Sequence, residues 1–233
     1  MSEAMPWLIW MFDPLRIMLL LPALVLAIYA SWKVRATYRK YLQVPTKKRV
    51  TAAQAAELIL NRAGVSGVKL AGTPRPLGDH YDPRTKTLRL SAPTSVSVAA
   101  VGVAAHEAGH AIQHARGYAP LALRSAVVPV ASFGSQLAFP LFFLGLIFRA
   151  DFLLTLGIGL FAAAVAFTLI TLPVEFNASR RAVAALRETG LVTREELGAV
   201  KEVLTAAALT YVAAAAMAAL QLIYMLLVAG RRR

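Results

Sequence analysis

The 233-residue sequence predicts a mainly α-helical, polytopic membrane protein, in which about four transmembrane helices accompany a small α+β region. Hydrophobic residues make up 58% of the chain and charged residues only 16%, whereas roughly a quarter of the residues of soluble proteins are charged. Uncharged stretches of about the 20 residues that a bilayer requires recur along the chain. The polar segment after the first stretch is long enough to fold outside the membrane.

Four stretches are predicted to cross the bilayer: residues 17–32, 125–148, 152–174 and 203–230. The first is short, but Leu15 and the apolar stem of Lys33 extend it. The aromatic segment of residues 5–12 before it suits a membrane interface. Residues 149–151 are expected to form a tight turn between the second and third spans.

The alternative for the first span is a cleaved signal peptide. Signal peptides carry their positive charge before the apolar run, whereas the basic cluster of residues 33–49 follows it here, so we expect an uncleaved anchor. Basic segments between spans stay in the cytoplasm, which places this cluster and residues 180–201 inside and the N-terminus outside. The terminal arginines, residues 231–233, oppose this topology because four spans place them outside.

The net charge of +13 also raises the alternative of nucleic-acid binding. The basic residues flank apolar spans, where they serve topology and contact anionic headgroups, and no aromatic platform accompanies them. We therefore expect the lipid bilayer, and no nucleic acid, as a partner. The chain has no cysteine, which excludes disulfides and thiolate metal sites.

The polar region begins with a predicted helix. Thr51 and Gln54 form a capping box for a helix that runs to about Arg62, and Gly64 can end it. A short strand over residues 65–70 is expected to follow.

A hairpin is then predicted, with strands at residues 79–81 and 87–90 and a turn at residues 82–85. The edge of residues 87–91 could pair with an extended peptide. Pro93 and Thr94 open a long helix that runs through about Arg116.

The strongest chemical signal lies on this helix. His106 and His110 are four residues apart on one helical turn and can hold a zinc ion, while Glu107 can activate a water. A catalytic zinc needs a third protein ligand. His114 is about 12 Å from His106 along a straight helix, so it is expected to support the site or lie at the surface. Glu175 follows the third span and returns to the same membrane face, although it could equally serve only a helix dipole.

Three segments resemble a known family: residues 105–113 (AHEAGHAIQ), 79–83 (DHYDP) and 175–181 (EFNASRR). They are similar to the YugP-type neutral zinc metallopeptidases of bacterial membranes, and more distantly to HtpX-type and CAAX prenyl proteases. The resemblance covers nearly the whole chain. It implies a zincin-like fold around the HExxH helix, His106, His110 and Glu175 as zinc ligands, and Glu107 as the catalytic base. The distant relatives usually have an aspartate where this chain has Ser179.

The expected activity is that of a zinc metalloendopeptidase, gluzincin-like, with one Zn²⁺ per chain and a peptide or membrane-protein substrate. Glu107 would take the proton of the water and pass it to the leaving amine. Further donors for the oxyanion or for the ligands could come from His80, Asn177, Ser179 or Arg181. The site is expected to face the cytoplasm at the inner membrane of a bacterium.

Two alternative functions have weaker support. A site-2-type intramembrane protease needs an aspartate ligand late in the chain, but the only aspartate after the motif is Asp151, in the tight turn. A non-catalytic, zinc-braced scaffold or chaperone-like protein would normally use four protein ligands and leave Glu107 without a task.

The sequence also predicts how the chain is divided. The expected segments are an anchor (1–34), the extramembrane region (35–120), two transmembrane helices (121–174), a third-ligand helix with its connector (175–202) and a last span (203–233). Thr193 and Glu196 cap a helix that continues into that span. Its alanine-rich face permits close approach of a second copy, so a homo-oligomer is one expected arrangement.

Overall fold

The computed structural model describes residues 13–231 and divides into two compact units. The helical unit comprises the chain up to Ala30, Leu123–Leu172 and the chain from Thr210. The mixed unit comprises Ser31–Ala122 and Pro173–Leu209. All four of the long helices contribute residues to both units.

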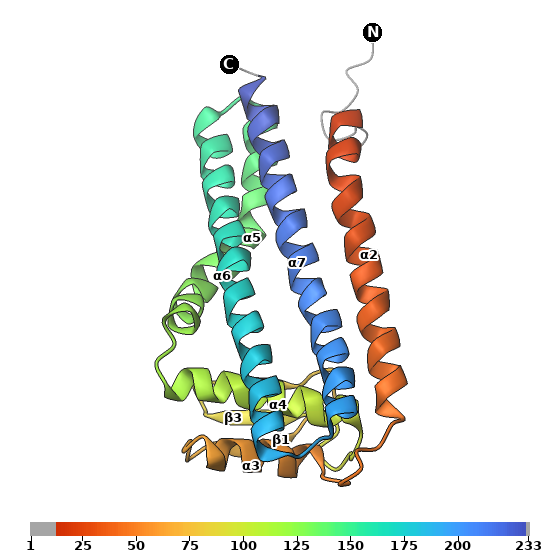
Figure 1. Ribbon diagram of the computed structural model, residues 1–233. Coiled ribbons are helices and arrows are strands. Elements are labelled where there is room, and N and C mark those ends of the chain that lie inside the picture. Colours follow the sequence, from red (N-terminus) through yellow and green to blue (C-terminus); the bar gives the residue numbers. More distant parts are fainter. Residues whose placement is uncertain (1–12, 232–233) are drawn as a thin grey trace. The chain divides into compact units, whose positions relative to one another are not determined.

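Four long helices supply the helical unit: α2 (Pro14–Leu42), α5 (Ala119–Phe148), α6 (Asp151–Thr189) and α7 (Arg194–Gly230) (Figure 1). Each is long and apolar enough to cross a membrane. The expected mainly helical, polytopic fold with four spans is therefore confirmed. The helices α2, α6 and α7 extend well beyond the predicted spans, and the predicted interfacial segment of residues 5–12 lies outside the described residues.

Close packing joins α5, α6 and α7 within the helical unit. Phe142, Leu154 and Met225 belong to one buried cluster. Gly157 is essential to this contact, because a Cβ there would lie 2.8 Å from the backbone of Ala138 and Phe142. Figure 1 shows α5 to be bent, as two prolines inside a helix predict.

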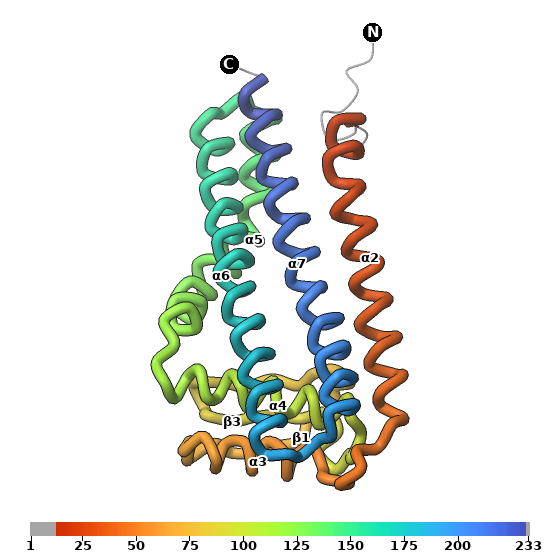
Figure 2. The backbone as a smooth tube through the Cα atoms, in the orientation of Figure 1, coloured from red at the N-terminus to blue at the C-terminus, as the bar shows by residue number. Residues whose placement is uncertain are grey.

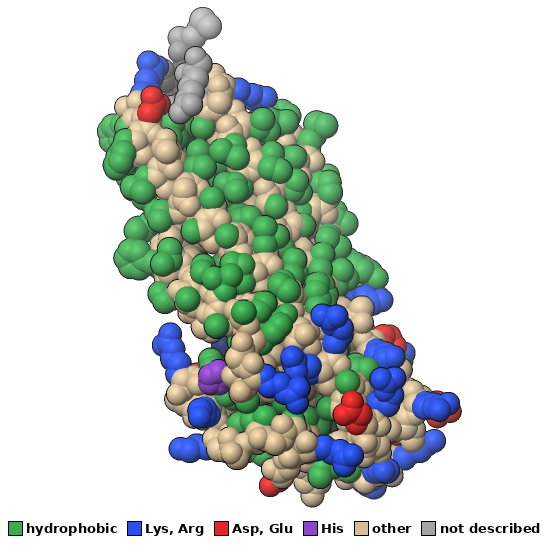
Figure 3. Space-filling view, turned by 60° about the vertical axis from the view of Figure 1, so that its left-hand side comes forward, with side chains coloured by type: hydrophobic (Ala, Val, Ile, Leu, Met, Phe, Trp, Pro, Cys, Tyr) green, Lys and Arg blue, Asp and Glu red, His purple; other side chains and the backbone are tan. Residues whose placement is uncertain are grey.

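The outer faces of these helices are apolar, as a bilayer requires. Met18 is 75% exposed and Phe133 69% exposed. Hydrophobic side chains cover a broad area of the surface in Figure 3, whereas Lys and Arg side chains gather outside it. In water such an area would favour aggregation, whereas in lipid it is the expected surface.

The mixed unit contains α3 (Ala52–Arg62), β1 (Lys69–Gly72), β2 (His80–Asp82), β3 (Thr87–Leu90) and α4 (Val98–Ala115) (Figure 2). Its core combines Leu88 of β3 and Ile59 of α3 with Val101 of α4. Leu186 of α6 and Val200 of α7 complete it, so the second half of α6 is fixed against α4.

The sheet has the order β1-β3-β2, with β1 parallel and β2 antiparallel to β3. The predicted hairpin is confirmed, but β3 is the central strand. Both of its sides are paired, so the expectation that a peptide could add to residues 87–91 is wrong. The strand predicted at residues 65–70 begins only at Lys69, because the Val65 amide donates to Leu60 and closes α3.

Helix boundaries follow their caps. The capping boxes at Thr51 and Thr193 are both present. α4 begins after Ser97, whose hydroxyl accepts a hydrogen bond from the Ala100 amide, so the predicted start at Pro93 is five residues too early. Gly117, with φ +60°, follows the end of α4 as expected.

Candidate metal centre

Three side chains from two helices converge in the mixed unit. His106 and His110 lie on α4, and Glu175 lies on α6. One carboxylate oxygen of Glu175, Oε2, is 3.2 Å from Nε2 of His106 and 3.5 Å from Nε2 of His110. The candidate ligand atoms all lie within 4.8 Å of one another. The predicted pairing of the histidine motif with a glutamate 69 residues after His106 is thus realised in space.

Gly109 allows α4 and α6 to approach this closely. It lies on α4 between His106 and His110 and faces Ala178 of α6. A Cβ at this position would lie only 2.6 Å from the carbonyl oxygen of Ala178. Since the obstacle is backbone, a larger residue would push the helices apart, and with them the histidines from Glu175.

The orientation of His110 is fixed by Gln113, one turn later on α4. Nδ1 of His110 lies 3.0 Å from Oε1 of Gln113, whose own Nε2 donates to the carbonyl of Val174 at 2.8 Å. Because a carbonyl only accepts, the amide nitrogen must point to Val174 and the amide oxygen to His110. Nδ1 therefore carries the proton, and the lone pair on Nε2 points to the cluster.

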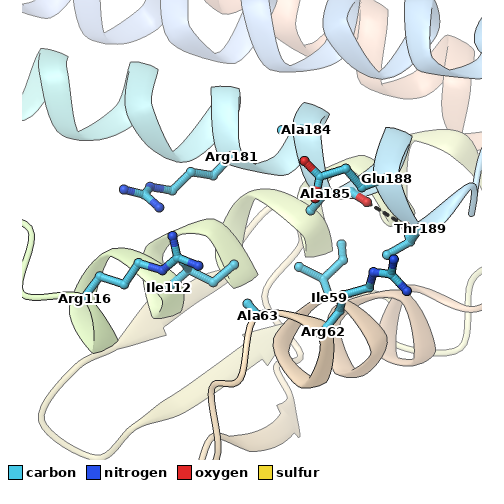
Figure 4. Close-up of a pocket in the computed structure, with 10 residues that line it drawn as sticks. All are labelled: Ile59, Arg62, Ala63, Ile112, Arg116, Arg181, Ala184, Ala185, Glu188 and Thr189. Atoms are coloured by element: carbon cyan, nitrogen blue, oxygen red, sulfur yellow. Dashed lines mark hydrogen bonds between the residues drawn. The ribbon is translucent and has the colours of Figure 1, made fainter.

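The amide of Gln113 is itself held by a network. Its Nε2 also donates to Oδ1 of Asn177 at 3.0 Å, and Nε of Arg181 donates to the same oxygen at 2.7 Å. Arg181 lies over the ring of Tyr118 and lines a pocket of about 200 Å³ (Figure 4). Figure 4 shows Arg181 and Arg116 extending along this pocket from α6 and from the end of α4. Asn177 and Arg181 were expected as donors to the oxyanion or to the ligands. In the structure they are connected to His110 indirectly, through hydrogen bonds with the amide of Gln113.

Ser179 contacts the other histidine directly. Its hydroxyl lies 3.1 Å from Nδ1 of His106, while Nε2 of His106 faces Glu175. The hydroxyl can accept a hydrogen bond from Nδ1–H, which leaves Nε2 as the metal-facing nitrogen. Ser179 thus occupies the place at which the distant relatives usually have an aspartate.

Glu107 differs from its neighbours in having no hydrogen bond or ion pair among the described residues. Its side chain is 7% exposed, yet within residues 13–231 no hydrogen bond or ion pair to its carboxylate is found. Burial lowers the pKa of the adjacent His110, but the hydrogen bond to Glu175 and the charges of Glu107 and Glu175 raise that pKa overall. The carboxylates of Glu107 and Glu175, which favour a proton on His110, also favour a divalent cation beside it.

The remaining histidines do not join the cluster. Nδ1 of His114 lies 2.9 Å from the Tyr81 hydroxyl. Burial and the nearby Asp82 raise the pKa of Tyr81, so the phenol keeps its proton and can donate a hydrogen bond to His114. His80, a candidate donor, is exposed, and its Nδ1 donates to the carbonyl of Gly78 at 2.8 Å.

The donor set suits zinc. Two imidazole nitrogens and one carboxylate oxygen are the ligands of several catalytic zinc sites, which keep a further position for water. Calcium and magnesium prefer oxygen ligands throughout, and no sulfur is present for softer metals. The tautomer of His110 and the burial of Glu175 support the same assignment.

Comparison with known proteins gives the same chemistry. Residues 16–230 match a family described as "Putative neutral zinc metallopeptidase". The chain is 43% identical over 209 residues to the "Putative membrane protease YugP" of Bacillus subtilis (strain 168), covering 89% of this chain and 93% of that protein. No solved structure shows significant similarity to the chain. Since the match extends over nearly the whole sequence, the chain belongs to this family of membrane zinc metallopeptidases.

Proposed function

We propose that the chain is a membrane-embedded zinc metalloendopeptidase of the gluzincin type. The observation that carries the proposal is Glu107, a buried residue beside His106, His110 and Glu175 whose carboxylate has no hydrogen bond or ion pair within residues 13–231. A purely structural metal site has no task for a carboxylate that stands beside the ligands without a hydrogen bond or ion pair of its own. A hydrolytic site needs this group to accept a proton.

Each residue has a distinct role in the proposed reaction. Zinc, when bound, acts as a Lewis acid that acidifies a water and polarises the scissile carbonyl. His106, His110 and Glu175 hold one such ion per chain. Glu107 takes the proton from the water and delivers it to the leaving amine.

The surrounding groups orient the ligands. Ser179 positions His106, and Gln113, with Asn177 and Arg181, positions His110. We propose His80 as a group that could meet the substrate, because the hydrogen bond found for it within residues 13–231 is to Gly78 of its own loop.

The location of the reaction follows from the chain. The five predicted segments place Glu175 directly after the third span, and the basic segments assign that face to the cytoplasm. We propose a bacterial inner-membrane enzyme whose cytoplasmic site acts on peptides or on exposed segments of membrane proteins. Homo-oligomerisation through the alanine-rich face of α7 is compatible with this arrangement.

The test compares wild type with Glu107→Gln, purified in detergent, for zinc content and cleavage of an unstructured protein such as casein. We expect one zinc per chain in both and cleavage by the wild type alone. Glu57→Gln, an exposed change on α3, is the matched control and should cleave normally. Zinc in both proteins with no cleavage by either would favour the zinc-braced scaffold, and a wild type without zinc would refute the proposal.

A further inference from the structure

A second hollow of the mixed unit lies between α6 and α7. It has a volume of about 590 Å³. Val183 and Phe176 of α6 form one wall, and Leu204 and Ala208 of α7 form the other. We call it the α6–α7 groove. Its walls are mainly apolar, so it suits a hydrocarbon chain better than a polar ligand.

Three cations line the same groove: Arg180, Arg187 and Lys201. All three are exposed, and no acidic residue lines the groove. Within the described part of the chain, none of the three makes an ion pair or a side-chain hydrogen bond. The groove therefore combines an apolar interior with a net charge of about +3 and no internal counter-ion.

The groove is also close, along the chain, to the apolar parts of both helices. Phe176 follows the α6 segment of the helical unit by four residues, and Ala208 precedes that of α7 by two. At 1.5 Å per residue, these groove residues lie within about 6 Å of helix from segments that suit a bilayer. The groove is therefore within a short distance, along both helices, of segments that an amphiphile in the membrane would contact.

We propose that the α6–α7 groove binds one anionic phospholipid, with its phosphate held by Arg180, Arg187 and Lys201 and part of an acyl chain against Val183 and Leu204. Arginine and lysine both bind phosphate, and an arginine can do so through two parallel hydrogen bonds. A zwitterionic lipid has the same acyl chains but carries a cation that these residues repel. The site therefore selects for headgroup charge.

The experiment titrates the delipidated full chain in a non-ionic detergent with phosphatidylglycerol or phosphatidylcholine of identical acyl chains. Native mass spectrometry counts bound lipid, and thermal unfolding reports stabilisation. We expect one tightly bound phosphatidylglycerol and only weak binding of phosphatidylcholine. The triple change Arg180→Gln, Arg187→Gln and Lys201→Gln should weaken phosphatidylglycerol binding on the order of 100-fold, at about fivefold per cation.

The matched control removes three exposed cations of the same unit outside the groove, by Arg62→Gln, Lys69→Gln and Arg84→Gln. It should bind phosphatidylglycerol like the wild type. Thr205→Trp fills the groove from α7 without changing charge and should also remove the bound lipid.

Three results would overturn the proposal. The first is equal binding of both lipids by the wild type, and the second is an equal loss of binding in the control triple variant. The third is stabilisation by inorganic phosphate alone that matches phosphatidylglycerol, which would make the groove a site for free anions.

Discussion

At the scale of single residues, Gln113 is the buried amide that sets the tautomer of His110. Replacing it by leucine keeps the volume but removes the acceptor for Nδ1. We expect Gln113→Leu to lower zinc affinity by about 10- to 100-fold, the usual effect of losing such a partner. Competition with a chromophoric chelator measures this.

The matched variant is Gln113→Glu, which keeps an acceptor for His110 but loses both donated hydrogen bonds. It should hold zinc more tightly than Gln113→Leu. Equal affinities in the wild type and the leucine variant would show that Gln113 serves packing alone.

Ser179 gives the second prediction at this scale. Ser179→Ala removes the contact to Nδ1 of His106 and should weaken zinc binding by about tenfold. Ser179→Asp supplies the charged acceptor of the distant relatives and should bind zinc at least as well as serine. Zinc titration of the wild type and the two variants measures these affinities. Tighter binding by the alanine variant would contradict the role of Ser179 in positioning His106.

Much of the metal centre could be predicted from the sequence, and the remainder shows where such reasoning ends. His106 and His110 can be predicted as a pair of ligands, because one helical turn brings them together. Glu175 could be predicted only because two spans return the chain to the same membrane face and because the sequence resembles a known family. No local pattern joins Glu175 to the histidines. The sequence does not identify Gln113 as a partner of His110, although its position one turn later on the helix is a usable signal.

At the scale of elements, the crossing of α4 and α6 depends on Gly109. A methyl group at this residue meets the Ala178 carbonyl oxygen at 2.6 Å. We expect Gly109→Ala to destabilise the fold by about 1–3 kcal/mol, as overpacking does, and to weaken zinc binding. Thermal unfolding in detergent, with and without zinc, measures both effects.

Gly198 of α7 provides the control, because nothing lies within 4 Å of a Cβ built there. Gly198→Ala should stabilise the helix by about 0.5–1 kcal/mol. If Gly109→Ala and Gly198→Ala change the melting temperature alike, the close approach of Ala178 does not limit the size of the residue at position 109.

The elements differ in how far local sequence determines them. The helix from Ala52 to Arg62 was predicted almost to the residue, because a capping box and Gly64 mark its ends. The start of α4 was misplaced, because residues 93–97 form backbone hydrogen bonds with residues 46–53 and with Ala92 instead of entering the helix. The central place of β3 depends on parallel pairing with β1, which no local pattern encodes.

At the scale of the whole molecule, zinc should contribute to stability because its ligands come from two different helices. A ligand that binds only the folded chain stabilises it by about 2.7 kcal/mol at 100 times its Kd. We expect chelation to lower the melting temperature of the wild type and of Glu107→Gln equally. Glu175→Gln should melt at a lower temperature and respond little to chelator, and a zinc response equal to wild type would exclude Glu175 as a ligand.

The separation of the ligands along the chain also bears on synthesis. Glu175 follows His106 by 69 residues, so at about 5–20 residues per second the ribosome needs roughly 3–14 s to pass from one to the other. During that interval the nascent chain carries both histidines and Glu107 but lacks the third ligand. With the proposed ligand set, the centre is complete only after all of α5 and most of α6 have been made, so we expect an unfinished chain to be inactive toward its neighbours at the site of translation.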